Sequence, residues 1–287
     1  MTAGEQITAV GHLAGGPLSA RGPLSTADPE TGPPGTGRPA PRLHWWKELI
    51  YSASFYALYS MTRNTQGSKK VSFEHAFAHA RHLIKVEQTL HIFQEAWVQA
   101  RFLGAHWFIQ FWNVYYGTAH FVITLLALVY CYRFLPRRYP QMRNTLACMT
   151  ALALIGFATF PLLPPRLLPT GSGYGFVDTL KTIGGLWSFD SGAVAKASNQ
   201  YAAMPSLHFG WASWVTLTLW PWATSRPRQA ILLTYPLLTL FGIVVTANHY
   251  FLDAAGGAGV FLGGLGLGTV IAELWARRLT RTFPVAE

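Results

Sequence analysis

The chain has 287 residues, of which 51% are hydrophobic, 14% aromatic and only 12% charged. Because soluble domains carry about 25% charged residues, this composition excludes an ordinary soluble domain and indicates an integral membrane protein. The net charge of +10 falls mainly in short links between apolar stretches and lacks the interleaved aromatic residues of an RNA-binding surface, so we expect no nucleic-acid partner. The two cysteines have no metal-ligand spacing, and we expect no metal and no cofactor.

Residues 1–42 are rich in Gly, Pro, Ala, Ser and Thr and lack hydrophobic periodicity, which predicts a disordered N-terminal tail. This tail contains no apolar segment of the kind found in a cleaved signal peptide. We expect one membrane-embedded catalytic domain over residues 43–279, without an internal repeat, and a short C-terminal tail over residues 280–287.

The first part of this domain is ambiguous. Trp45 and Trp46 suit a membrane interface, and the uncharged stretch 49–61 spans the membrane only if it extends back through them. Otherwise it forms an interfacial helix. Apolar residues in 62–101 recur at helical intervals, which predicts an amphipathic helix on the membrane surface or against the bundle. Within it we interpret Glu87 as a surface carboxylate in preference to a functional one.

Five longer apolar stretches follow, at residues 102–132, 144–163, 207–222, 230–247 and 250–275. Together with the first stretch they predict an all-α integral membrane bundle of about six transmembrane helices. Asn113, Tyr116 and His120 share one face of the first of the five. They are candidates either for a headgroup pocket or for helix–helix hydrogen bonds. Gly259–Gly263 and Gly264–Gly268 in the last stretch match a small-residue helix-packing pattern.

The positions of the basic residues orient the bundle. Basic residues gather in 133–143, in 226–228 and in the C-terminal tail, and the positive-inside rule places these segments in the cytoplasm. Both termini are then cytoplasmic in a multi-pass protein of the cell membrane. Arg166, His208 and His249 fall together on the extracytoplasmic face.

Two histidines lie where apolar spans meet loops. His208 ends the sequence Met204-Pro205-Ser206-Leu207-His208, and His249 lies in Asn248-His249-Tyr250-Phe251-Leu252-Asp253. The two intervening spans, joined by a short turn, return both histidines to one face of the membrane. Asp253 is four residues after His249, so on a helix its carboxylate reaches the imidazole, fixes the tautomer and makes the other nitrogen more basic. Such a histidine is a competent nucleophile or general base.

Other residues near these histidines suit phosphate. Pro205-Ser206 reads as a helix start with Ser206 as N-cap, and helix N-termini favour anions. His208 then faces that anion as a second acid or base. Arg166, directly after two prolines, has a planar donor fork that matches phosphate oxygens, although an arginine at a span end also snorkels to the interface. Lys181 and Lys196, in the loop 167–205, are further candidates.

The two histidine motifs resemble the second and third motifs of the type 2 phosphatidic acid phosphatase superfamily, and Pro164-Pro165-Arg166 resembles the first. The resemblance is strongest to the inositol phosphorylceramide synthase-like, or inositolphosphotransferase, branch. It implies a helical membrane enzyme with a type 2 phosphatidic acid phosphatase/chloroperoxidase-like core that forms a phosphohistidine. It further implies His249 as nucleophile, Asp253 as its orienting partner, His208 as leaving-group acid and Arg166 on phosphate.

The chain departs from the superfamily pattern at two places. Thr159 stands where the superfamily usually has a lysine, and Gly242-Ile243 stands where it usually has Ser-Arg. The inositol phosphorylceramide synthase-like branch tolerates both departures, which favours that branch. The groups that complete the phosphate cradle therefore stay open, with Lys181 and Lys196 as candidates.

Three functions follow as hypotheses. The first is a membrane-embedded phosphotransferase that moves a phospho-headgroup, such as phosphoinositol, to a lipid alcohol. The second is a lipid phosphate phosphatase, in which water is the acceptor. The third is a non-enzymatic haem-binding membrane protein with His208 and His249 as axial ligands. The expected partners of the enzyme are a lipid phosphate and the membrane, while the sequence gives neither the lipid nor the oligomeric state.

Overall fold

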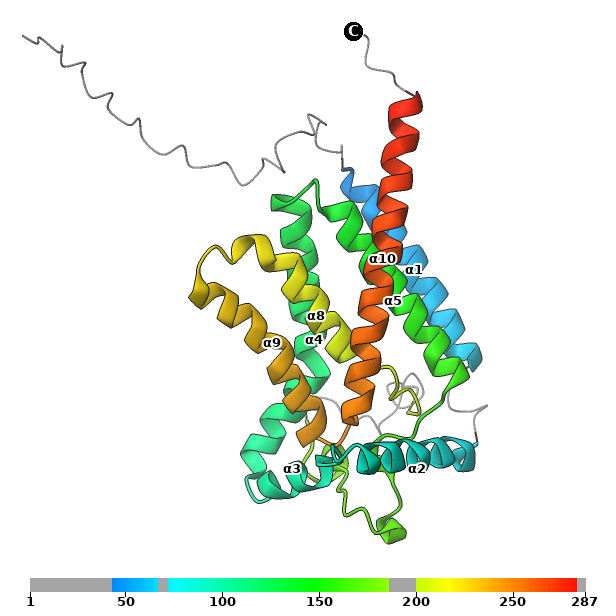
Figure 1. The fold of residues 1–287 in the computed structure, drawn as a ribbon, viewed down its shortest axis with the longest axis vertical. Helices are drawn as coiled ribbons and strands as arrows, with labels where there is room; N and C mark the ends of the chain where they lie inside the picture. Colours follow the sequence, from blue (N-terminus) through cyan, green and yellow to red (C-terminus); the bar gives the residue numbers. More distant parts are fainter. Residues whose placement is uncertain (1–42, 67–71, 186–199, 283–287) are drawn as a thin grey trace, which may run out of the picture. The chain divides into compact units, whose positions relative to one another are not determined.

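The computed structural model describes residues 43–66, 72–185 and 200–282. The predicted tail 1–42, residues 283–287 of the second predicted tail, and Lys196 lie outside these ranges. Within the described ranges the regular structure is helical, and this confirms the predicted all-α class. The helices, labelled in Figure 1 where there is room, are α1 (Trp45–Gln66), α2 (Phe73–Thr89), α3 (Glu95–Phe102), α4 (His106–Phe134), α5 (Tyr139–Thr159), α6 (Thr179–Thr182), α8 (Leu207–Leu219), α9 (Arg226–Val245) and α10 (Phe251–Thr282).

Four described helices are long and apolar enough to cross a membrane, namely α4, α5, α9 and α10. The predicted count of six is not confirmed. Helix α8 has only 13 residues, because it starts after Pro205 and gives way to a 3-10 turn at Trp220–Trp222. At 1.5 Å per residue it is about 20 Å long, shorter than the roughly 30 Å hydrocarbon core. Helix α1 has 22 residues but is not among the four apolar helices.

Glycines let α10 approach its neighbours closely. A β-carbon added to Gly264 would lie 2.7 Å from the backbone nitrogen of Met149, and one added to Gly268 would lie 2.5 Å from that of Thr145. Helices α10 and α5 therefore pack backbone against backbone, which confirms the packing interpretation for this pair of glycines. The other predicted pair differs, because a β-carbon at Gly263 would meet Leu152 whereas one at Gly259 would meet open space.

The basic links gather at one end of the bundle. Arg138, between α4 and α5, donates from Nη2 to the carbonyl of Leu217 near the end of α8, at 3.0 Å. Gln141, near the start of α5, donates from Nε2 to Thr269 Oγ1 in the C-terminal half of α10, at 2.7 Å. The opposite ends of α8 and α10 carry His208 and Asp253.

Helix α2 lies crosswise at the end of the bundle where α10 starts (Figure 1). Its buried face packs on a cluster that includes Leu162, Leu163 and Tyr250, which is the packing expected of an amphipathic helix. Glu87 is 0% exposed, so its interpretation as a surface carboxylate was wrong. The physical reason is helical spacing, since Glu87 follows the buried Leu83 and Ile84 on the same face.

Candidate active site

His249 lies in a tight, buried turn between α9 and α10. Helix α9 ends at Val245, and the backbone then turns through Ala247, whose φ of 54° lies in the left-handed region. A residue with a β-carbon is uncommon there, and such local strain often occurs at functional sites. The N–H groups of Asn248 and His249 both donate to the carbonyl of Ile243, at 3.0 and 3.1 Å, and these bonds hold the turn.

Asp253 ties His249 to the start of α10. The Nδ1 atom of His249 lies 3.2 Å from Asp253 Oδ2, and the backbone N–H of Tyr250 donates to the same oxygen at 3.0 Å. The two side chains are 4% and 0% exposed. The expected contact between the two side chains is present. His249 lies two residues before the helix, however, so the expectation that both residues belong to one helix was wrong. The contact forms because Asp253 caps the first turn, where a carboxylate is also favoured by the helix dipole.

Helix α8 starts beside this pair. Ser206 is its N-cap residue as predicted, but its side chain makes no capping bond, and its buried Oγ has no partner among the described residues. Its backbone N–H instead donates to the carbonyl of Asp253 at 2.9 Å, which joins the starts of α8 and α10. The ring centroids of His208 and His249 are 5.5 Å apart. The Nε2 atom of His249 is buried without a partner in the described part of the chain.

Two of the three predicted pocket residues lie beside His208. The ring of Tyr116 stacks on His208 with centroids 4.3 Å apart, and His120 lies 4.1 Å from His208 by the same measure. His120 Nδ1 is 3.0 Å from the carbonyl of Tyr116, so its ring is held by its own helix. One face of α4 therefore closes over His208.

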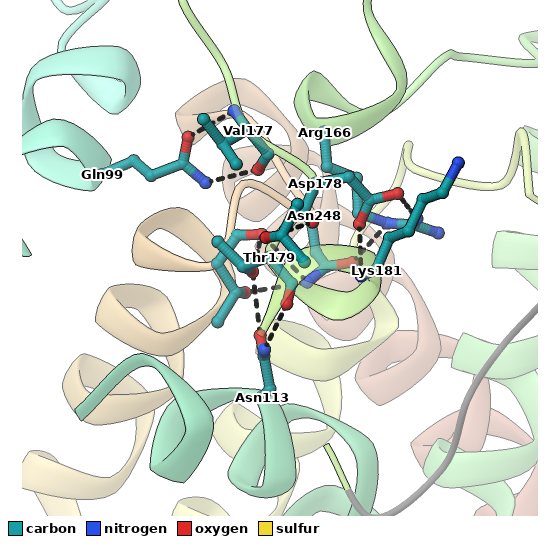
Figure 2. A network of polar contacts seen from close by, with 10 residues as sticks. Gln99, Asn113, Arg166, Val177, Asp178, Thr179, Lys181 and Asn248 are labelled. Carbon is teal, nitrogen blue, oxygen red and sulfur yellow. Dashed lines mark hydrogen bonds and ion pairs between the residues drawn. The ribbon is translucent and has the colours of Figure 1, made fainter. Parts of the chain in front are cut away.

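Asn113 has a different environment. Its Nδ2 donates to the carbonyls of Thr179 and Gly184, at 3.0 and 2.8 Å, and its Oδ1 accepts from Thr179 Oγ1 at 3.0 Å. Both amide hydrogens are therefore engaged, and the side chain anchors the segment around α6 to α4 (Figure 2). Gln99 extends the same network through Val177, with bonds of 2.9 Å in both directions.

Arg166 is fixed next to the turn that bears His249. Its Nε donates to Asn248 Oδ1 at 3.0 Å, and its Nη1 pairs with Asp178 Oδ2 at 3.0 Å (Figure 2). Its backbone N–H donates to the carbonyl of Ala247 at 2.8 Å. With a side chain only 10% exposed, Arg166 does not have the solvent-exposed head of a snorkelling arginine.

Of the other two predicted cations, the structure describes Lys181, which lies beside Asp178 (Figure 2). Lys181 is exposed on α6, where its backbone N–H meets Asp178 Oδ1 at 3.4 Å, and Lys196 lies outside the described residues. Packing accounts for the Gly242-Ile243 departure from the superfamily pattern. A β-carbon at Gly242 would lie 2.8 Å from the ring of Trp112, and Ile243 is only 1% exposed. Apolar packing therefore occupies the places where the superfamily usually has Ser-Arg.

Four polar residues of this region were not predicted as site residues. Asn248 and Asp178 hold Arg166, and Glu87 and Glu95 bind the first turn of α10. Asn248 lies inside a quoted motif and Asp178 follows Arg166 by twelve residues, but neither position carries a sequence signal for this contact. Burial raises the pKa of both Glu87 and Glu95, to about 9 for Glu87.

A protein-family model described as the PAP2 superfamily matches residues 81–267. The matched stretch runs from within α2 to within α10 and includes Arg166, His208, His249 and Asp253. Comparisons with curated proteins and with solved structures give no match.

Proposed function

The chain belongs to the PAP2 superfamily, whose activities are of the lipid phosphate phosphatase and phosphotransferase type, and from this premise we propose a specific reaction. The protein moves a phospho-headgroup, such as phosphoinositol, from a donor lipid to a lipid alcohol through a phosphohistidine at His249. The observation that carries the proposal is the buried His249–Asp253 pair, at 3.2 Å, beside the ring of His208.

The proposed chemistry has two half-reactions. The Nδ1 proton of His249 stays on the imidazole, hydrogen-bonded to Asp253, while Nε2 attacks phosphorus. In the same step His208 gives its proton to the departing lipid alkoxide. The phosphorus–nitrogen bond replaces the phosphorus–oxygen bond. The acceptor hydroxyl then gives its proton to His208 and attacks phosphorus, which frees His249. The same residue serves as acid and then as base, as expected for two mirror-image steps.

Arg166 and Ser206 are the proposed phosphate ligands. The guanidinium is oriented by Asn248 and Asp178, at 3.0 Å each, before any substrate arrives. A preoriented, largely buried cation stabilises charge on the transferring phosphoryl group without reorganisation. The Oγ of Ser206, which has no hydrogen-bond partner among the residues that the structure describes, supplies a second donor at the start of α8. Tyr116 and His120 border the place of the headgroup in this proposal.

The alternative is hydrolysis, in which water accepts the phosphoryl group from the same phosphohistidine. Burial favours transfer, because His249 is 3% and Asp253 0% exposed, and a dry site protects the intermediate from water. Family membership favours both enzymatic hypotheses over the haem-binding one.

The test is a double-label assay with purified protein. Phosphatidylinositol, labelled in both the phosphate and the headgroup, is incubated with and without a lipid alcohol such as ceramide or diacylglycerol. We expect a new lipid that carries both labels and whose yield rises with the acceptor. Release of water-soluble phosphate or headgroup phosphate at a rate independent of acceptor would instead make the protein a hydrolase. A parallel panel with phosphatidic acid identifies a phosphatase, and His249→Ala is the background control.

We further propose that the site faces the extracytoplasmic side of the cell membrane and that both termini are cytoplasmic. In a variant with Cys131 and Cys148 replaced by alanine, exposed Thr170 and exposed Ser225 are changed to cysteine one at a time. We expect an impermeant maleimide to label Thr170→Cys on intact cells, and Ser225→Cys only after permeabilisation. The reverse labelling would place the site in the cytoplasm.

A further inference from the structure

Two buried carboxyl groups from outside the four apolar helices meet at the start of α10. Glu87 of α2 and Glu95 of α3 are both 0% exposed. Glu87 Oε1 accepts from the backbone N–H of Leu252 at 2.7 Å, and Glu95 Oε1 accepts from that of Phe251 at 2.9 Å. The first N–H groups of a helix have no partner within the helix. The two glutamates therefore supply partners from two other helices to consecutive amides beside the catalytic pair.

The second oxygen of each carboxyl group, Oε2, has no hydrogen-bond donor in the described ranges. Both Oε2 atoms are buried and take no hydrogen from any other group in the described ranges. The two carboxyl groups accept from consecutive amides, and no cation pairs with either of them in the described ranges. Two ionised carboxylates can only accept hydrogen bonds, whereas one retained proton lets one carboxyl group donate to the other. The pair then carries a single negative charge, whereas two unpaired charges in this place would be costly.

The groups that face the pair favour this shared proton. Asp253, on α10, adds a third carboxyl whose charge raises the pKa of both glutamates after the larger effect of burial. Tyr250 precedes α10, and burial, followed by these three carboxyls and Tyr174, raises its pKa well above its usual value. It stays neutral and donates its hydroxyl to the carbonyl of Leu163 at 3.1 Å.

We propose that Glu87 and Glu95 share one proton and act as positioning residues, which hold the start of α10 so that Asp253 and His249 keep their catalytic geometry. The catalytic part of this inference rests on the proposed function. Loss of the shared proton removes the bond between the carboxyl groups and puts two adjacent charges near Asp253. The glutamates then separate, and the amides of Phe251 and Leu252 lose their fixed partners.

The sign of the pH effect follows from the two states of Glu87. In the unfolded chain the carboxyl has its usual pKa of 4.5, whereas in the folded protein the pKa is about 9. The folded state therefore binds more protons between these values, and the free energy of unfolding falls as pH rises through this window. The stabilising contribution is complete below pH 4.5 and is lost by about pH 9. Catalytic positioning is retained until the shared proton leaves, near the upper value.

Glu87→Gln mimics the protonated state permanently. Its amide oxygen accepts from Leu252, its amide N–H donates to Glu95, and the pair never carries more than one negative charge. At neutral pH we expect the activity of Glu87→Gln to be within about threefold of wild type. Wild type should lose activity as the pH rises through about 9, and Glu87→Gln should not. Glu87→Ala, which removes both hydrogen bonds, should lose about tenfold or more at all pH values. Exposed Glu74→Gln in the same helix is the matched control and should follow wild type.

The rate and the unfolding temperature of detergent-solubilised protein are both measured from about pH 5 to about pH 10. We expect the unfolding temperature of wild type to fall from pH 5 to about 9 by at least about 4 °C more than that of Glu87→Gln. Equal slopes, or a folded Glu87→Gln as inactive as Glu87→Ala, would overturn the shared proton. If wild type shows no phosphoryl transfer at all, the proposed function fails, and the unfolding slopes still decide whether the pair shares a proton.

Discussion

We expect His249→Ala to abolish both turnover and the formation of any phosphoenzyme. The imidazole Nε2 is the atom proposed to attack phosphorus, and the neighbouring His208, whose ring centroid is 5.5 Å away, is assigned to the leaving oxygen instead. Loss of a nucleophile is not compensated by substrate binding or by a better leaving group. The measurement is the initial rate with the doubly labelled donor lipid, together with the radioactivity retained on quenched protein.

Asp253→Asn should leave a small residual activity. The amide oxygen of asparagine still accepts from the N–H of Tyr250, so the cap of α10 survives. The negative charge is lost, however, and with it the tautomer and orientation of His249, which costs about 10²–10⁴-fold in turnover. Thermal unfolding of the variant checks that the cap is kept. Full activity in a folded Asp253→Asn protein would show that the carboxylate does not assist His249.

The second large effect concerns His208→Ala and depends on the leaving group. If His208 protonates the departing oxygen, a lipid alkoxide needs this proton, whereas nitrophenolate departs almost unaided. General acid catalysis is worth about 10²–10⁴-fold. We therefore expect a loss of that size on the natural donor lipid, and a much smaller loss on a nitrophenyl ester of the same phospho-headgroup. The ratio of the two rates in each variant is the quantity measured.

Two comparisons make this ratio decisive. His249→Ala should fail on both substrates, because no leaving group replaces the nucleophile. Exposed His82→Ala, a histidine of α2, should match wild type on both. Equal losses for His208→Ala on both substrates would mean that His208 binds phosphate or shapes the site, since a purely acid role cannot affect a substrate that needs no proton.

The meeting of the two histidines was predictable from the sequence, because two apolar stretches joined by a short turn bring their far ends to one face. The local geometry was not. The sequence of residues 245–250 does not predict the left-handed backbone conformation of Ala247, because the usual signal for that conformation is glycine. His249 consequently lies in a turn before α10, and Asp253 reaches it as the capping residue.

The buried carboxyl pair and the shortness of α8 could not be predicted from the hydrophobic pattern of the sequence. Charged residues in an amphipathic segment are usually exposed, and the contact that buries Glu87 joins residues 165 positions apart in the chain. Hydropathy alone extended α8 through Trp220-Pro221-Trp222, although these three residues form a 3-10 turn. In both cases the deciding information was tertiary packing or backbone geometry, which apolar periodicity does not contain.

The most direct measurement of the proposed mechanism is the identity of the phosphorylated residue. Wild-type protein is mixed briefly with donor lipid labelled in the phosphate, quenched in alkali and digested, and the labelled peptide is sequenced by mass spectrometry. We expect an acid-labile, alkali-stable phosphate on His249 that is absent from His249→Ala. Label on His208 or on any other residue, or an enzyme that turns over without retaining label, would contradict His249 as the nucleophile.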